Sequence, residues 1–207
     1  MREGIKIAIK SCAKYADRRL AQENTWLLDC QFPYFYQTAP AGASDGFNDI
    51  APKVVQACKY ALETNTHRLF ICDDDTYVRP ERLLTGSWEN DYVGFVRTGR
   101  NGALPYIQGS SFWLSKRAMT AVVRYEDLMI NGVPDDVAVG RVMYAAGIPF
   151  THEHRFGVEE TYPHPDRVPL ATNRIISCHK CLPDAMYEVH KRWLASQKED
   201  IIGGARG

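Results

Sequence analysis

Residues 69–75 have the sequence LFICDDD, in which four apolar residues lead directly into three aspartates. The apolar run has the length and character of a short strand buried in a sheet. Asp73, Asp74 and Asp75 follow at the carboxyl end of that strand, where ligands bind in open α/β sheets. Three adjacent carboxylates repel one another, so a positive group is expected to bind there.

A divalent cation that holds a diphosphate satisfies this charge best. Sites for Mg²⁺ and Mn²⁺ commonly use one or two protein carboxylates and leave other positions to phosphate oxygens. A solvated acidic loop is the alternative interpretation, but the aspartates follow an apolar run and not a polar one. The stretch therefore favours a site for a metal and a phosphate.

The rest of the chain alternates between strand and helix patterns, which favours an α/β sandwich around a mostly parallel sheet. Ile5, Ile7 and Ile9 alternate with Lys6 and Lys10, so we expect a first strand with one face in water. The further expected strands are 32–36, 69–72, 92–96, 112–114 and 174–178. The expected helices are 16–28, with Leu20, Trp26 and Leu27 facing inward, then 50–64, 80–84, 116–125, 134–146 and 183–196. The expected irregular segments are the loop 38–48, the turn 131–132, the stretch 156–173 and a frayed tail over 198–207.

Composition sets the limits within which a function must fall. The 207 residues contain 45% hydrophobic residues and 25 basic and 25 acidic side chains. We expect one domain over 1–207. The absence of net charge argues against broad binding to nucleic acid. No apolar stretch of 18 residues is present, so no membrane segment is expected.

Three further motifs carry candidate chemistry. Asp135 and Asp136 stand at an expected helix start, where the helix dipole favours carboxylates, although either could also serve as a general base. The segment 106–115, YIQGSSFWLS, contains Gly109, which permits close backbone approach, but it is equally typical of a tight turn before a strand. His179 follows the last expected strand and could complete a metal site.

The cysteines suggest a different metal site. Cys178 and Cys181 form a CxxC pair, and the segment 152–154, His-Glu-His, could supply the second ligand pair of a structural zinc. Cys58 and Cys72 lie within apolar patterns and are expected to be small buried hydrophobes.

Taken together and in order, these motifs resemble the fringe-like β-1,3-glycosyltransferases, a family of GT-A fold. The resemblance covers nearly the whole chain. The family shows an Arg-rich helix ending in Thr-Trp, an apolar strand entering a triple Asp, and an Asp-x-Tyr-x-Gly strand, which is matched loosely here. It also shows a small-residue Gly turn into a strand ending in Leu-Ser-Arg, an acidic pair before Val-x-x-Gly, and a late strand ending in His before a Pro-led helix. The matching segments are 18–26, FICDDDTYV, NDYVGF, GSSFWLSKRA, PDDVAVG and SCHKCLPDAM.

The resemblance implies an inverting hexosyl transfer from a UDP-sugar to a hydroxyl group of a glycan or glycoprotein. It implies Asp75 and His179 as ligands of Mn²⁺ or Mg²⁺, and Asp136 as the base, with Asp135 as the alternative. The remaining implied roles are helping to hold the metal and diphosphate (Asp74), contacting ribose or sugar (Asp73), facing the nucleotide (Ser11, Lys14 and Arg18) and lining the sugar site (Gln108, Gly109, Ser110 and Ser111). The family's usual Gly-Gly is Gln108-Gly109 here, so the specificity is not carried over.

The sequence leaves two alternative functions open and gives an expected location in the cell. A non-catalytic sugar-binding or nucleotide-binding relative is the main alternative, followed by a haloacid-dehalogenase-type phosphatase, whose motif does not accommodate Tyr77. The chain contains no Asn-x-Ser/Thr sequon, and its start is too charged for a signal peptide. We therefore expect a cytoplasmic protein, with a soluble fragment of a luminal Golgi-type enzyme as the alternative.

Overall fold

The structure is a computed structural model that describes residues 4–38, 50–98, 104–129, 133–156, 158–159 and 175–203. Its main sheet has six strands in the order β2-β1-β3-β6-β5-β7. Their bounds are Tyr34–Gln37, Ile5–Lys10, Arg68–Asp73, Tyr106–Ser115, Tyr92–Arg97 and Phe150–His152. Only β6 runs against the other five. The expected mostly parallel sheet is therefore confirmed.

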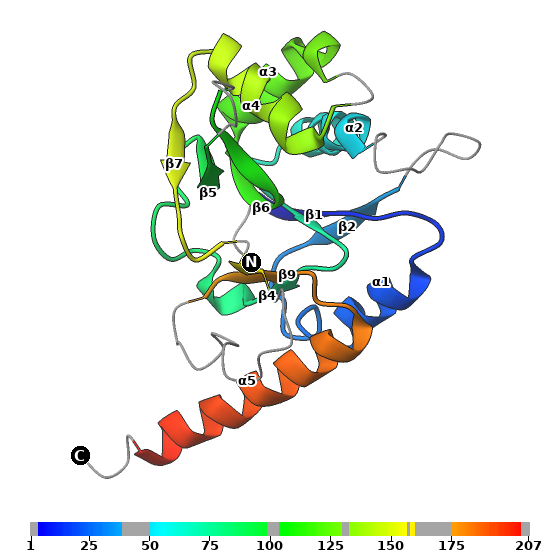
Figure 1. Cartoon of the computed structure of the whole chain (residues 1–207), viewed down its shortest axis with the longest axis vertical. Helices are drawn as coiled ribbons and strands as arrows, with labels where there is room; N and C mark the ends of the chain where they lie inside the picture. The colour runs from blue at the N-terminus through cyan, green and yellow to red at the C-terminus, as the bar shows by residue number, and fades with distance from the viewer. Residues whose placement is uncertain are drawn as a thin grey trace.

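Helices cover both faces of this sheet (Figure 1). One face carries α2 (Ile50–Glu63), α3 (Lys116–Arg124) and α4 (Asp135–Ala145). The other carries α1 (Ala16–Glu23), α5 (Pro183–Gly203) and a small sheet of β4 (Tyr77–Val78), β9 (Ser177–His179) and β8 (Val158–Glu159). Short 3₁₀ helices span Pro80–Arg82 and Glu126–Leu128. None of the helices in these described ranges is long and apolar enough to cross a membrane.

Strand β3 is buried on both faces, which explains its unbroken apolar run. Leu69 and Ile71 pack into the core under α2, α3 and α4. Phe70 and Cys72 pack into the second core, which also contains Trp26 and lies on the side of α1 and α5. The strand thus ends in the middle of the sheet and delivers its aspartates to a covered edge.

Two expectations about the first 28 residues are wrong. Strand β1 has no face in water, because both faces of the sheet are covered and only Lys6 is partly exposed, while Lys10 is 4% exposed. Helix α1 ends at Glu23, and Leu20 is 55% exposed, although Trp26 and Leu27 are buried as expected. Amphipathic spacing did not identify the buried residues of the helix itself, which are Ala21 and Gln22, while Trp26 and Leu27 lie in turns after it.

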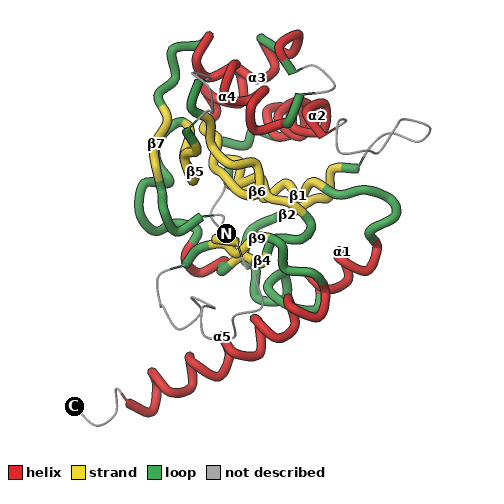
Figure 2. Tube along the Cα trace, viewed as in Figure 1, coloured by secondary structure: helices red, strands yellow, loops and turns green. Residues whose placement is uncertain are grey.

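Other differences lie in the second half of the chain. Residues 106–111 belong to the ten-residue strand β6 and not to a turn, since β6 pairs with both β3 and β5. Residues 158–159 form a strand, and helix α5 continues to Gly203 where a frayed tail was expected. The loop 38–48 (apart from Thr38), the turn 131–132 and most of 156–173 lie outside the described residues. Figure 2 shows how far the long helix α5 extends from the sheets.

Candidate functional site

A cavity of about 530 Å³ opens where β1 and β3 end, beside β6 and the N-terminus of α4. One side is basic and aromatic, the middle is acidic, and the remaining side is formed by β5, β6 and the start of α4. Its lining residues include Lys10, Ser11, Lys14, Tyr15, Arg18, Lys53, Asp73, Asp74, Asp75, Arg97, Gln108, Gly109, Ser110, Asp135, Asp136 and His179.

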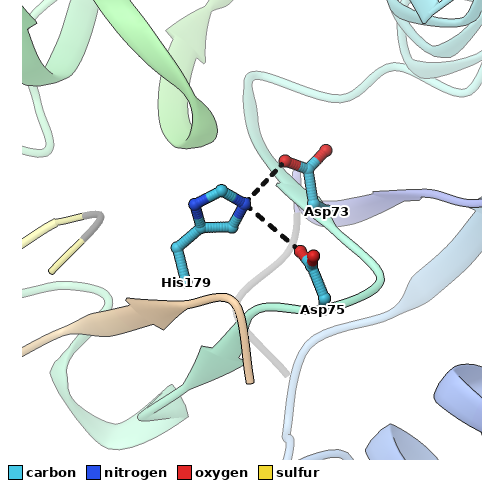
Figure 3. A group of neighbouring side chains, drawn as sticks. All are labelled: Asp73, Asp75 and His179. Carbon is cyan, nitrogen blue, oxygen red and sulfur yellow. Dashed lines mark ion pairs between the residues drawn. The ribbon is translucent and has the colours of Figure 1, made fainter. Parts of the chain in front are cut away.

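Asp73, Asp75 and His179 converge on one point in this cavity (Figure 3). His179 Nε2 lies 3.3 Å from Asp75 Oδ1 and 3.6 Å from Asp73 Oδ2. One potential ligand atom from each residue lies within 4.8 Å of the others, so a single ion could contact all three. Two carboxylate oxygens and one imidazole nitrogen suit Mn²⁺, so the chemistry of this donor set fits the expected cation.

Pairing between distant segments brings His179 to the aspartates. Strand β4 pairs with β9, with Tyr77 opposite Cys178, and this places the end of β9 beside the acidic loop. The buried side chain of Gln22 donates to the Asp73 and Thr76 carbonyls, both at 3.2 Å, and thereby holds the same loop from α1. The group is therefore fixed by backbone contacts on two sides.

The carboxylates differ in charge environment. Burial alone would raise the pKa of Asp75, but His179 and Arg18 hold it below its usual range. Burial raises the pKa of Asp73, against the opposing effect of Lys10. Without a bound cation, Asp73 is therefore harder to ionise than Asp75. A divalent ion would stabilise the ionised form of Asp73, which agrees with a role as a metal ligand.

Asp74 lies outside this group of three. Its carboxylate accepts hydrogen bonds from Ser11 Oγ at 2.8 Å and from Arg18 Nη1 at 3.0 Å, and the residue is 4% exposed. The Arg18 guanidinium also stacks on Tyr15, 3.8 Å from the ring centroid. Asp74 therefore lies on the basic side of the cavity and outside the group of three, whereas it had been expected to help to hold the metal and the diphosphate.

The adjacent carboxylates at the start of α4 have different partners. Asp135 is 7% exposed and accepts from the Lys10 ammonium at 2.5 Å. Asp136 is partly exposed and accepts from the backbone N–H groups of Gly109 at 3.3 Å and Val137 at 2.8 Å. Burial, followed by the charge of Asp135, raises the pKa of Asp136. Asp136 is consequently the better placed proton acceptor of the two.

The segment expected to line the sugar site is divided by the alternation of β6. Gln108 lines the cavity and accepts from Arg97 Nε at 3.0 Å, and Gly109 and Ser110 also line it. Ser111 does not, because its hydroxyl group is buried against that of Ser177 at 2.6 Å.

Among the lining residues that the sequence did not single out, Tyr15, Lys53 and Arg97 carry chemistry of their own. Lys53 and Arg97 contribute positive charge, and Tyr15 contributes an aromatic face. Lys53 is buried at 5% exposure and donates to the Ser11 carbonyl at 2.7 Å. The sequence signal for Lys53 was its position next to the apolar stripe of the helix expected over 50–64. A lysine buried there must find a hydrogen-bond or ion-pair partner, which could have marked it as a polar residue inside the protein.

The zinc alternative is not supported. In the described ranges of the chain, the one group of side chains that could hold a metal is Asp73, Asp75 and His179. Cys58, Cys72, Cys178 and Cys181 are buried and form no disulfide within the described residues, and burial was expected for the first two.

Comparison with known proteins identifies the fold. No protein-family model matches the sequence, and no curated protein matches it significantly. A solved glycosyltransferase involved in glycosylation of the major capsid of PBCV-1 is similar, with a TM-score of 0.56 at 11% identity over 91% of this chain and 98% of that one. An active-site mutant of LgtC is similar with a TM-score of 0.52 at 11% identity, over 89% of this chain and 94% of that one. The chain therefore has the expected GT-A-type fold.

Proposed function

We propose that this protein is a metal-dependent glycosyltransferase that transfers a hexose from a UDP-sugar, or another nucleotide-sugar, to a hydroxyl group of a glycan or glycoprotein. The observation that carries the proposal is the placement of Asp73, Asp75 and His179 in one cavity with Asp136. The likeness to two glycosyltransferase structures supports it at the level of fold. The narrower fringe-like membership stays a prediction.

Asp73, Asp75 and His179 would hold Mn²⁺ or Mg²⁺. The chemistry that such an ion supplies is positive charge for the diphosphate and for the departing nucleoside diphosphate. On the basic side, the Tyr15 ring, Lys14 and Arg18 would bind the nucleotide end of the donor. Lys14 and Arg18 both lie over the Tyr15 ring, so this side combines charge with an aromatic face.

Asp136 would accept the proton of the acceptor hydroxyl. Its hydrogen bonds from Gly109 and Val137 fix the carboxylate, and its raised pKa makes it a stronger base than an ordinary aspartate. Direct attack of that hydroxyl group on the anomeric carbon inverts the configuration and requires no covalent intermediate. Inversion is the outcome that we propose for this site.

Calorimetric titration of UDP with Mn²⁺, repeated with EDTA, tests the donor site. We expect binding that EDTA abolishes and that Asp75→Asn and His179→Ala both lose. Asp136→Asn should keep the binding and lower transfer by about 10²–10⁴-fold. Absence of UDP binding in both conditions would refute the donor assignment. Binding without transfer or hydrolysis of any UDP-sugar tested would favour the non-catalytic alternative.

A further inference from the structure

Lys10 has three acceptors for the three protons of its ammonium group. Its Nζ atom lies 2.9 Å from Asp73 Oδ1, 2.5 Å from Asp135 Oδ2 and 2.8 Å from the Gly109 carbonyl oxygen. Its side chain is 3% exposed. The ammonium group is therefore fully coordinated by the protein, and a substrate phosphate could be bound only by breaking one of these contacts.

These three acceptors come from different parts of the site. Asp73 belongs to the group that would hold the metal, and Asp135 precedes Asp136 at the start of α4. Gly109 is the residue whose N–H donates to Asp136 Oδ2. Lys10 thus holds the chain neighbour of Asp136 and also one of its hydrogen-bond donors. Asp136 itself forms no ion pair with Lys10 in the described contacts.

We propose that Lys10 is a positioning residue that fixes Asp136 for proton transfer by holding Asp135 and Gly109. This inference rests on the proposed function. Lys10 also gives the two adjacent aspartates different tasks. Asp135 is committed to the ammonium group, and Asp136 is left to face the cavity with backbone donors behind it.

The charge around Lys10 gives this role a distinctive signature. Lys10 lies beside Asp73, so replacing Lys10 removes a positive charge next to Asp73, Asp75 and His179. The attraction of these three residues for a divalent ion is therefore not reduced. A residue that bound the donor phosphates would instead lose affinity for UDP when it was removed. If Lys10 positions Asp136, its removal should lower kcat and leave the Kd for UDP unchanged. If Lys10 binds the donor phosphates, its removal should raise that Kd.

The test compares Lys10→Met with wild type in UDP–Mn²⁺ calorimetry and in transfer at saturating donor. We expect a Kd within about threefold of wild type and a fall in kcat of about 100-fold, since small misplacement of a reacting group costs this much. Lys59→Met, an exposed lysine paired with Glu126 and away from the cavity, is the matched control and should change neither value. A rise in Kd that matches the fall in kcat, or an unchanged kcat, would overturn the proposal.

A double-mutant cycle with Asp135→Asn isolates the route of the effect. If Lys10 acts through Asp135, the kcat of the double variant should be no lower than that of Lys10→Met alone. Multiplying losses would show that Lys10 acts independently of Asp135, against the proposal. Should Lys10→Met fail to fold around its unpaired Asp135, the double variant is compared with Asp135→Asn. A Kd for UDP–Mn²⁺ that rises in step with the loss of kcat between these two variants would then overturn the proposal. UDP binding by wild type separates failure of this role from failure of the donor site.

Discussion

The backbone N–H of Cys181 donates to the Asp75 carbonyl oxygen at 2.7 Å. This bond ties the turn after β9 to the acidic loop, and the turn is possible because Lys180 adopts a left-handed conformation with φ of 61°. His179 is the residue just before that turn. The position of the imidazole beside Asp75 thus depends on the backbone of its neighbour.

Lys180→Val should weaken the metal site without changing a ligand. A β-branched residue is strained at positive φ, at a cost of about 1–3 kcal/mol, and relief of that strain would move His179. We expect weaker Mn²⁺ binding together with a lower unfolding free energy, measured by calorimetry and chemical denaturation. Lys180→Gly removes the same side chain but accepts the conformation, so it is the control and should keep Mn²⁺ affinity. Equal losses in both variants would point to the lysine side chain instead.

Gly109→Ala should impair turnover more than stability. A Cβ atom there would lie 3.0 Å from Asp135 Oδ1 and 3.2 Å from Asp136 Cβ, so the start of α4 would have to shift by a few tenths of an ångström. We expect a fall in kcat of about tenfold or more, with UDP–Mn²⁺ binding retained.

Gly147→Ala is the control for that variant. Gly147 has φ of 62°, but a Cβ atom at this position would have no neighbouring atom within 4 Å. The substitution should therefore cost about 1 kcal/mol of stability and leave kcat unchanged. A kcat of wild-type value in Gly109→Ala would mean that the close approach of β6 to α4 has no catalytic importance.

The sequence predicted what depends on local pattern. The run 69–72, the start of the helix expected over 116–125 and the helix start at Asp135 all agree with the structure, because each is specified by a few adjacent residues. Asp75 and His179 were also recognised as candidate metal ligands, and the structure brings them together with Asp73, which was expected to contact the ribose or sugar.

The expectations that were wrong concern features that depend on contacts between residues far apart in the sequence. Lys10 was expected in water, since alternation alone cannot reveal the buried Asp135 that lies 125 positions away. Residues 106–111 were not expected to be strand, and a tight turn was one of two interpretations, because Gly and Ser are typical of turns. Their pairing with β3 and β5 makes them strand instead, and Gly109 permits the close approach of this strand to α4.

Asp74→Asn should destabilise the protein and spare the metal site. Asp74 is buried with Ser11 and Arg18, and an amide cannot accept both of their hydrogen bonds as well as a carboxylate does. We expect a loss of about 1–3 kcal/mol in the free energy of unfolding, with Mn²⁺ affinity close to wild type. Asp75→Asn is the matched control, and it should lose Mn²⁺ binding while keeping the free energy of unfolding close to that of wild type. Loss of Mn²⁺ binding in Asp74→Asn at unchanged stability would restore Asp74 as a ligand.

The acid limb of turnover should report Asp136. A base must be ionised, and burial and Asp135 raise the pKa of Asp136 above its ordinary value of 3.8, so kcat should fall as the pH drops through a midpoint above that value. Asp135→Asn removes a negative neighbour and releases Lys10, and both changes favour the ionised form of Asp136. The midpoint should therefore move to lower pH in this variant, whatever its maximal rate. The measurement is kcat against pH at saturating donor and acceptor for both proteins. A midpoint that moves upward, or stays fixed, would assign the limb to another group.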